Sequence, residues 1–191
     1  MSRDPAAEYR EVAATFTARV EGTDPGSWGD PSPVPEWVAR DVVAHLIEWL
    51  PQVLGFQVAE VPPVADDPVA AWRAHSDGVQ ALLDDPVRSR RSVSNPNFGE
   101  MAAADVVDRL YTPDVFMHTW DLARATGQDD RLDPDRCAAG LAAGEPMEGI
   151  MRSSGQFGPR VPVPDDADVQ DRMLGFIGRD PAWRAPERRA V

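Results

Sequence analysis

Apolar side chains recur every three or four positions along most of this 191-residue chain, a spacing typical of amphipathic helices. The first stretch shows the pattern clearly, since Tyr9, Val12, Ala13, Phe16 and Val20 would share one helical face. No stretch shows the sustained alternation of apolar and polar residues that indicates a half-buried strand. Five or six helical segments are predicted, and they cover residues 6–20, 38–58, 68–83, 100–125, 134–152 and 168–177.

Proline and glycine mark the boundaries of these segments and interrupt two of them. Pro51 lies within the second segment and is expected to kink it. Thr112-Pro113 interrupts the fourth segment in one of two ways. Either Pro113 kinks a continuous helix, or Thr112 caps a new helix that has Pro113 at its first position. Residues 86–99 are loop-like, and residues 95–99 within them predict a turn.

Four long amphipathic helices joined by loops of mixed length predict an all-α protein built as a helical bundle. The length of 191 residues and the hydrophobic content of 42% are sufficient for a substantial core. We therefore expect residues 1–191 to form a single helical domain.

The net charge of −13 argues against binding to nucleic acid or to anionic membranes, because both require basic surfaces. The one cysteine, Cys137, cannot form an intramolecular disulfide, and we expect it to act as a small hydrophobe. The amino terminus lacks the apolar region of a signal peptide, and no apolar run approaches the ~18 residues of a membrane span. These features predict a cytoplasmic protein.

The segment from Asp114 to Asp121 contains the residues that are the clearest candidates for a chemical role. Positions three and four apart are neighbours on a helix, so Asp114, His118 and Asp121 are predicted to line one stripe. A carboxylate and an imidazole at this spacing can bind the same metal ion. The best candidate for a further ligand is His45, which lies at the edge of the apolar stripe of another helix. Helical bundles form metal sites from inward-facing side chains of different helices in this way.

Each of these residues also has a purely structural interpretation. Asp114 and His118 would stabilise a helix as an ion pair by roughly 0.2–0.5 kcal/mol. Asp114 would also suit the first turn of a capped helix, where the helix dipole favours a carboxylate. Asp121 is a fourth ligand, a partner that orients a histidine, or the partner of Arg124, and we favour the last two interpretations. His75 is predicted to be a core or boundary histidine.

Several segments resemble a known superfamily. Residues 37–46, Trp-Val-Ala-Arg-Asp-Val-Val-Ala-His-Leu, resemble the segment that carries the first histidine ligand in the DinB-like, mycothiol-dependent maleylpyruvate isomerase N-terminal superfamily. Residues 114–127 resemble the second ligand segment of an actinobacterial branch of metal-binding proteins, and residues 170–183 are similar to the end of that branch. The resemblance spans nearly the whole chain, and its His-Thr-Trp-Asp-Leu-Ala motif is fairly specific.

This resemblance implies a DinB-like four-helix bundle with additional short helices and a divalent metal near its core. The isomerase binds its metal through a histidine of the second helix and a later Glu-x-x-x-His pair, whose places match His45, Asp114 and His118. Zinc or nickel is expected, because imidazole suits both ions. Asp114 replaces a glutamate, so its shorter arm would either leave the metal further away or bind it through water. The isomerase also has a second, C-terminal domain, for which we expect no counterpart here.

The resemblance implies an enzyme that uses a thiol such as mycothiol for transfer or isomerisation. Two histidines and one carboxylate leave a position on the metal open for a small-molecule or thiol substrate. The alternative is a non-catalytic metal- or small-molecule-binding helical module with a closed metal shell, and a third interpretation is a bundle whose His–Asp pair is only structural. Members of the superfamily often pair, which makes a homodimer through exposed bundle faces a further expectation.

Overall fold

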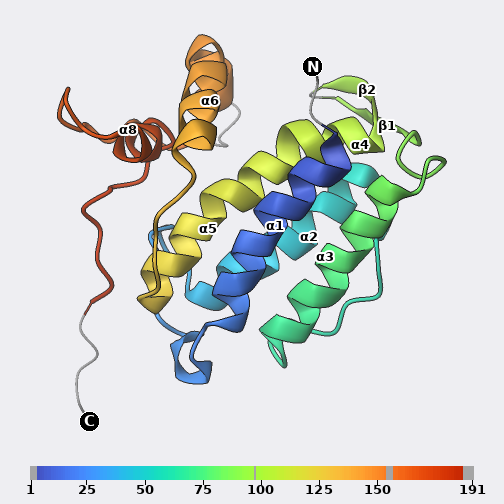
Figure 1. Cartoon of the computed structure of the whole chain (residues 1–191), viewed down its shortest axis with the longest axis horizontal. Coiled ribbons are helices and arrows are strands. Elements are labelled where there is room, and N and C mark those ends of the chain that lie inside the picture. The colour runs from blue at the N-terminus through green and yellow to red at the C-terminus, as the bar shows by residue number, and fades with distance from the viewer. Residues whose placement is uncertain (1–3, 97, 154–156, 187–191) are drawn as a thin grey trace.

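The computed structural model describes residues 4–96, 98–153 and 157–186, and these are mostly helical (Figure 1). Four helices form the body of the molecule: α1 (Pro5–Glu21), α2 (Ala39–Leu54), α3 (Pro68–Asp84) and α5 (Thr112–Thr126). Helices α1 and α2 each contact both α3 and α5, so the four helices close around a shared apolar core. The expected all-α, DinB-like fold is confirmed.

Shorter elements extend this body. Helices α6 and α8 pack against each other beside α5 (Figure 1), where they form a second apolar cluster that includes the buried Cys137. Burial raises the pKa of the Cys137 thiol to about 11, as expected of a small hydrophobe. The predicted helix over 134–152 is divided among three of these elements. The shorter elements are η1 (Pro25–Ser27), α4 (Ala103–Val106), a π-helical turn (Val107–Tyr111), α6 (Pro134–Gly144), η3 (Glu145–Met147), α7 (Glu148–Ser153) and α8 (Val169–Phe176).

A short antiparallel hairpin lies where only loop was predicted. Strand β1 (Ser92–Asn95) pairs with β2 (Gly99–Ala102), so the expectation that the chain lacks strands is wrong for this segment. Each strand has four residues, and Val93 is the one buried residue among them. Four residues with one buried side chain are too few for a recognisable alternation. Gly99 has a φ of +78°, in keeping with the predicted turn, although residue 97 of that turn lies outside the described residues.

The backbone stays helical through Thr112. Its φ and ψ are −59° and −44°, and its N–H bonds to the carbonyl of Val107, five residues earlier, as in a π-helix. The Thr112 hydroxyl forms no capping bond and has no partner among the described residues. The interpretation in which Thr112 caps a new helix is therefore wrong. The wider π-helical turn precedes Pro113, which has no N–H to donate.

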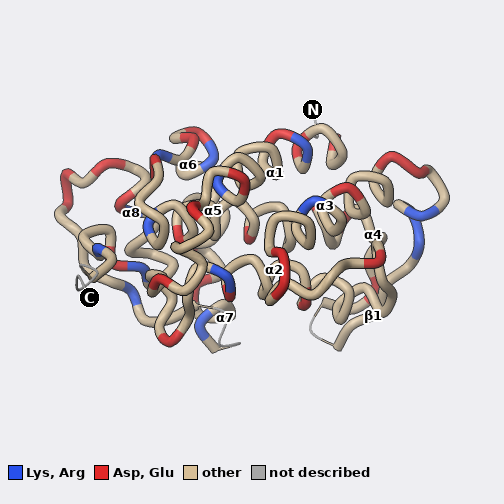
Figure 2. The backbone as a smooth tube through the Cα atoms, turned by 90° about the horizontal axis from the view of Figure 1, so that it is seen from below, with Lys and Arg blue, Asp and Glu red and all other residues tan. Residues whose placement is uncertain are grey.

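Acidic residues occur along the whole backbone (Figure 2), in keeping with the net charge of −13. A short basic run lies in the loop before β1, and parts of it are engaged within the chain. The Arg91 guanidinium lies 4.0 Å from the centre of the Phe56 ring, and Arg88 donates to the carbonyl of Val58. Among the described residues, no helix has both the length and the apolar character needed to cross a bilayer.

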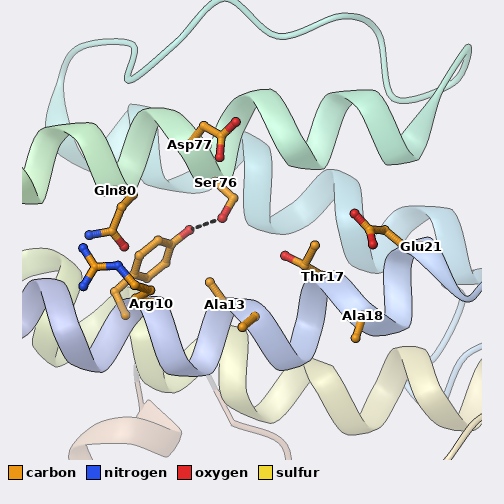
Figure 3. Close-up of a pocket in the computed structure, with 10 residues that line it drawn as sticks. Arg10, Ala13, Thr17, Ala18, Glu21, Ser76, Asp77 and Gln80 are labelled. Atoms are coloured by element: carbon orange, nitrogen blue, oxygen red, sulfur yellow. Dashed lines mark hydrogen bonds between the residues drawn. The ribbon is translucent and has the colours of Figure 1, made fainter.

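A groove with a volume of about 330 Å³ runs between α1 and α3 (Figure 3). Its described lining residues all belong to these two helices, and a hydrogen bond from the Tyr9 hydroxyl to Ser76 Oγ, 3.1 Å long, connects them. None of the residues discussed above as metal ligands lines this groove. This groove is therefore separate from the residues with metal-binding potential.

His75 is a core histidine, as expected. It is fully buried on α3, and its Nε2 lies 2.9 Å from the Tyr111 hydroxyl. Its Nδ1 has no hydrogen-bond partner among the described residues. Burial disfavours the charged imidazolium and lowers the pKa of His75 from 6.5 to about 4.

Replacing His75 with glutamine should make the protein less sensitive to acid. The unfolded chain binds a proton near pH 6.5 that the folded chain accepts only near pH 4, so the free energy of unfolding falls as the pH drops through this window. Between pH 7 and pH 5 this group should cost the wild type about 2 kcal/mol. His75→Gln should not show that part of the decrease in the free energy of unfolding. Urea unfolding of both proteins at the two pH values measures it, and equal losses would contradict the assignment.

Candidate metal centre

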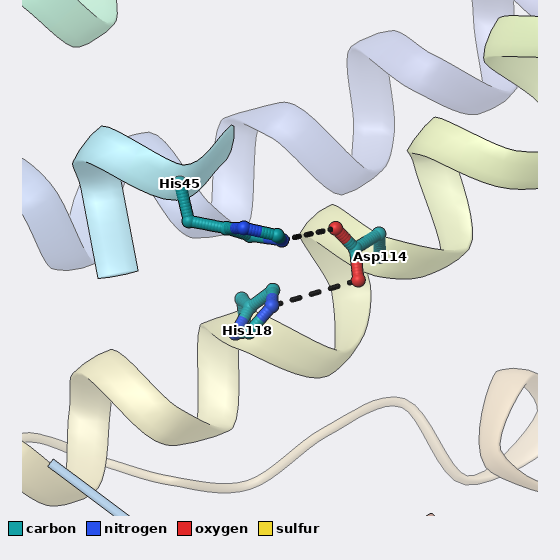
Figure 4. Close-up of side chains that lie close together, drawn as sticks. All are labelled: His45, Asp114 and His118. Atoms are coloured by element: carbon teal, nitrogen blue, oxygen red, sulfur yellow. Dashed lines mark hydrogen bonds and ion pairs between the residues drawn. The ribbon is translucent and has the colours of Figure 1, made fainter. Parts of the chain in front are cut away.

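The three candidate ligands converge where α2 packs against α5 (Figure 4). His45 comes from α2, while Asp114 and His118 are one turn apart on α5. At the start of α2, the Asp41 carboxylate accepts the N–H of Val38 at 2.9 Å, which satisfies a helix-end donor although Val38 has no capping side chain. The apolar stripe of α2 then faces the core and leaves His45, with 32% of its side chain exposed, at the edge.

Asp114 lies between the two histidines and contacts both. Its Oδ2 is 3.2 Å from His45 Nε2, and its Oδ1 is 3.5 Å from His118 Nε2. The indole N–H of Trp49 also donates to Oδ2, at 2.9 Å. A tetrahedral ion with bonds of ~2.1 Å separates its ligand atoms by ~3.4 Å. Each of the three residues offers one ligand atom within 4.8 Å of the others, so the cluster fits a small divalent ion.

One side of the cluster is open and another is covered by an aromatic ring. The exposed fraction of the side chain is 21% for Asp114 and 7% for His118. The Trp37 ring centre lies 5.0 Å from that of His45 and 5.9 Å from that of His118, so the indole packs on both imidazoles.

The residue before Trp37, Glu36, has a φ of +68°, an unfavourable conformation for a residue with a side chain. Strained backbone thus leads directly into the residue that covers the cluster.

Asp121 holds His118 from outside the cluster. Its Oδ2 lies 2.9 Å from His118 Nδ1, and its side chain is fully buried. When Nδ1 donates its proton to Asp121, the lone pair of Nε2 is directed toward the other candidate ligands. This is the orienting role expected above. The alternative pairing with Arg124 is wrong, because the guanidinium of Arg124 pairs with Asp130 instead.

Arg179 is a partner of this site that no pattern in the sequence predicted. Its Nε lies 2.9 Å from Asp121 Oδ1, and its Nη2 lies 3.1 Å from Asp121 Oδ2. The two residues are 58 positions apart, so no helical spacing could connect them. Arg179 lies within residues 170–183, which are similar to the end of the actinobacterial branch, but that similarity does not indicate which residue Arg179 contacts.

The charges of the cluster stabilise one another. Burial raises the pKa of Asp114, but the charge of His118 and hydrogen bonds from His45 and Trp49 outweigh burial and leave that pKa below its usual value. Burial lowers the pKa of His118, but Asp114 and Asp121 outweigh burial and leave it raised. Without metal, the cluster therefore favours ionised carboxylates and a protonated His118. A metal ion that binds here has to displace that proton.

Two proteins of Mycobacterium tuberculosis are similar to this chain over almost their whole length. They are the uncharacterized protein MT0763 of strain CDC 1551 / Oshkosh and the uncharacterized protein Rv0738 of strain ATCC 25618 / H37Rv. Each is 30% identical over 180 residues, which cover 92% of this chain and 98% of the relative. No solved structure gives a significant match.

The sequence model of one protein family matches more than half of the chain. This family is the mycothiol maleylpyruvate isomerase N-terminal domain, and the match covers residues 9–123. The matched region contains α2 and most of α5, and with them His45, Asp114 and His118. Together with the helical fold, the match shows that the chain belongs to the family of the mycothiol maleylpyruvate isomerase N-terminal domain.

Proposed function

We propose that this protein binds a divalent metal ion, zinc or nickel, through His45, Asp114 and His118. The metal serves to bind a low-molecular-weight thiol such as mycothiol for transfer or isomerisation. The convergence of the three side chains from two helices is the observation that carries the proposal. The family, whose name refers to a mycothiol-dependent isomerase, supports a thiol as the small-molecule partner.

The set of donor atoms favours a metal over a purely structural ion pair. Two imidazole nitrogens and one carboxylate oxygen suit zinc or nickel, and three protein ligands leave one position of a four-coordinate ion for water or substrate. The partial exposure of His45 and Asp114 provides access to that position. Within the described parts of the chain, this is the one group of three or more such side chains that meets these distances.

A divalent ion at this site would lower the pKa of a bound thiol, so that a thiolate nucleophile is present near neutral pH. The side chains of the protein orient the ligands. Trp49 holds the Asp114 oxygen nearest His45, and Trp37 packs over the imidazoles and excludes water from that side. Asp121 already accepts hydrogen bonds from His118 and Arg179, so it orients a ligand and does not exchange protons with a substrate.

Removal of either histidine ligand should abolish stoichiometric metal binding. His45→Ala and His118→Ala should each lower zinc affinity by more than the roughly 100-fold that changes outside the ligand shell reach. The third histidine of the chain is the matched control, and His75→Gln should bind zinc like the wild type. Elemental analysis and calorimetry on protein purified without chelators or nickel resin provide the measurement. Full metal content in both alanine variants would refute the assignment.

Replacing Asp114 with asparagine should weaken zinc binding less than the loss of either histidine. The substitution removes the charge of one ligand. It also removes the ion pair that favours protonation of His118, and that proton competes with the metal for the imidazole. Trp49 already engages one of the two carboxylate oxygens. Zinc titrations of the three variants at pH 7 rank the ligands. A larger loss for Asp114→Asn than for His118→Ala would reverse this ranking.

A low-molecular-weight thiol should bind the metal as thiolate. Titration of the cobalt-substituted protein with mycothiol should change the visible spectrum through a new sulfur ligand and release protons, because free thiols near pH 7 are mostly protonated. The S-methylated thioether of mycothiol, which cannot form a thiolate, is the matched control ligand. An unchanged spectrum at millimolar thiol, with cobalt bound, would exclude thiol activation. The alternative of a non-catalytic metal-binding module would then account for the site.

A further inference from the structure

The turn after α8 holds Arg179 in a defined place. The N–H of Gly178 bonds to the carbonyl of Gly175 at 3.2 Å, and the N–H of Arg179 bonds to the carbonyl of Leu174 at 2.8 Å, the two bonds of a Schellman motif. Gly178 has a φ of +86°, and a Cβ there would lie 3.0 Å from the Pro159 carbonyl oxygen. This conformation suits glycine, so the chain leaves α8 in one direction.

The closing segment is docked against α5 on both sides of Asp121. On one side, Leu174 and Phe176 of α8 share a buried apolar cluster with Trp120 of α5. On the other, Arg124 of α5 donates a hydrogen bond of 3.0 Å to the carbonyl of Pro181. Arg179 lies between these two attachments in the sequence, and its guanidinium meets the Asp121 carboxylate.

The contact between Arg179 and Asp121 is a two-pronged ion pair. Each carboxylate oxygen receives one guanidinium N–H, a geometry that sets the plane of the carboxylate as well as its position. The Asp121 side chain has no exposure to solvent, so an unpaired charge there would be costly. Its Oδ2 also accepts the Nδ1 proton of His118 at 2.9 Å. Arg179, Asp121 and His118 thus form a continuous chain of hydrogen bonds that ends at the candidate metal site.

We propose that Arg179 is a positioning residue of the metal centre. It orients the Asp121 carboxylate, and through that carboxylate it keeps the Nε2 lone pair of His118 directed at the metal. This inference rests on the proposed metal-binding function and deepens it. It makes the segment after α8, which lies outside the family match over residues 9–123, a part of the metal centre.

A purely structural ion pair that attaches α8 to α5 is the competing account. That role predicts a loss of stability when Arg179 is replaced, without a change in how His118 binds metal. The positioning role predicts a change in zinc affinity and in the state of the His118 ring. Arg172 of α8 provides a matched control, because it carries the same charge on the same segment and is exposed.

The test compares zinc binding by wild type, Arg179→Gln, Arg179→Lys and Arg172→Gln at a temperature where all are folded. Zinc affinity should fall about 10- to 100-fold in Arg179→Gln, the range found when an outer partner of a ligand is lost. Arg179→Lys should lose less zinc affinity, because lysine keeps the charge but lacks the two-pronged guanidinium donor. Arg172→Gln should bind zinc like the wild type. In the zinc-loaded wild type with 15N-labelled histidine, the Nδ1–H signal of His118 should be observed, and it should broaden in Arg179→Gln.

Each outcome decides between the accounts. Equal zinc affinity and an unchanged His118 signal in Arg179→Gln and Arg172→Gln would overturn the positioning role while leaving the proposed metal site intact. Absence of zinc binding by the wild type would instead overturn the proposed function, and the positioning role with it. If Arg179→Gln does not fold, Arg179→Lys decides the question, since a wild-type zinc affinity and His118 signal in that variant would show that the fork does not orient Asp121.

Discussion

The packing of α2 against α5 is the constraint on which the candidate metal centre depends. His45 and Asp114 are 69 positions apart, and only this contact brings their side chains within 3.2 Å. The buried stripe of α2 fixes the rotation of the helix about its axis, because any other rotation would expose apolar side chains to water. His45 at the edge of that stripe is then directed toward the first turns of α5.

Helix α5 is itself held on more than one side. One part of its surface joins the main core with α1 and α2, and another part joins the cluster formed with α6 and α8. The same helix also carries two buried polar side chains that belong to the candidate site, His118 and Asp121. Their charges are tolerated because each has partners: His118 meets two carboxylates, and Asp121 meets a histidine and Arg179. The apolar packing thus fixes the position of α5, and the hydrogen bonds among Arg179, Asp121 and His118 orient the His118 ring.

Local signals in the sequence were sufficient for much of this arrangement. The spacing of Asp114, His118 and Asp121 predicted a shared helical face, and the structure places the first two beside His45. Resemblance to a known superfamily was needed to choose His45, because a histidine at the edge of an apolar stripe is otherwise ambiguous. That these residues bind a metal is still a proposal.

Other features could not be predicted because they depend on contacts distant in the sequence or on competing local signals. Arg179 reaches Asp121 only after α8 has docked on α5, and no pattern of spacing encodes that contact. Thr112-Pro113 is a good helix start by local criteria, yet the chain continues through it as a π-helical turn. The two strands of the hairpin, residues 92–95 and 99–102, have one buried residue between them, which is too weak a pattern to distinguish from a loop.

The proposed function requires that His45, Asp114 and His118 hold one divalent ion. Crystal diffraction from the zinc-loaded protein on both sides of the zinc absorption edge locates that ion. We expect one anomalous peak between α2 and α5, at ~2.0–2.2 Å from Nε2 of each histidine and beside the Asp114 carboxylate. A zinc peak elsewhere on the molecule, or no peak at this position in crystals that contain zinc, would show that these three residues do not hold the ion.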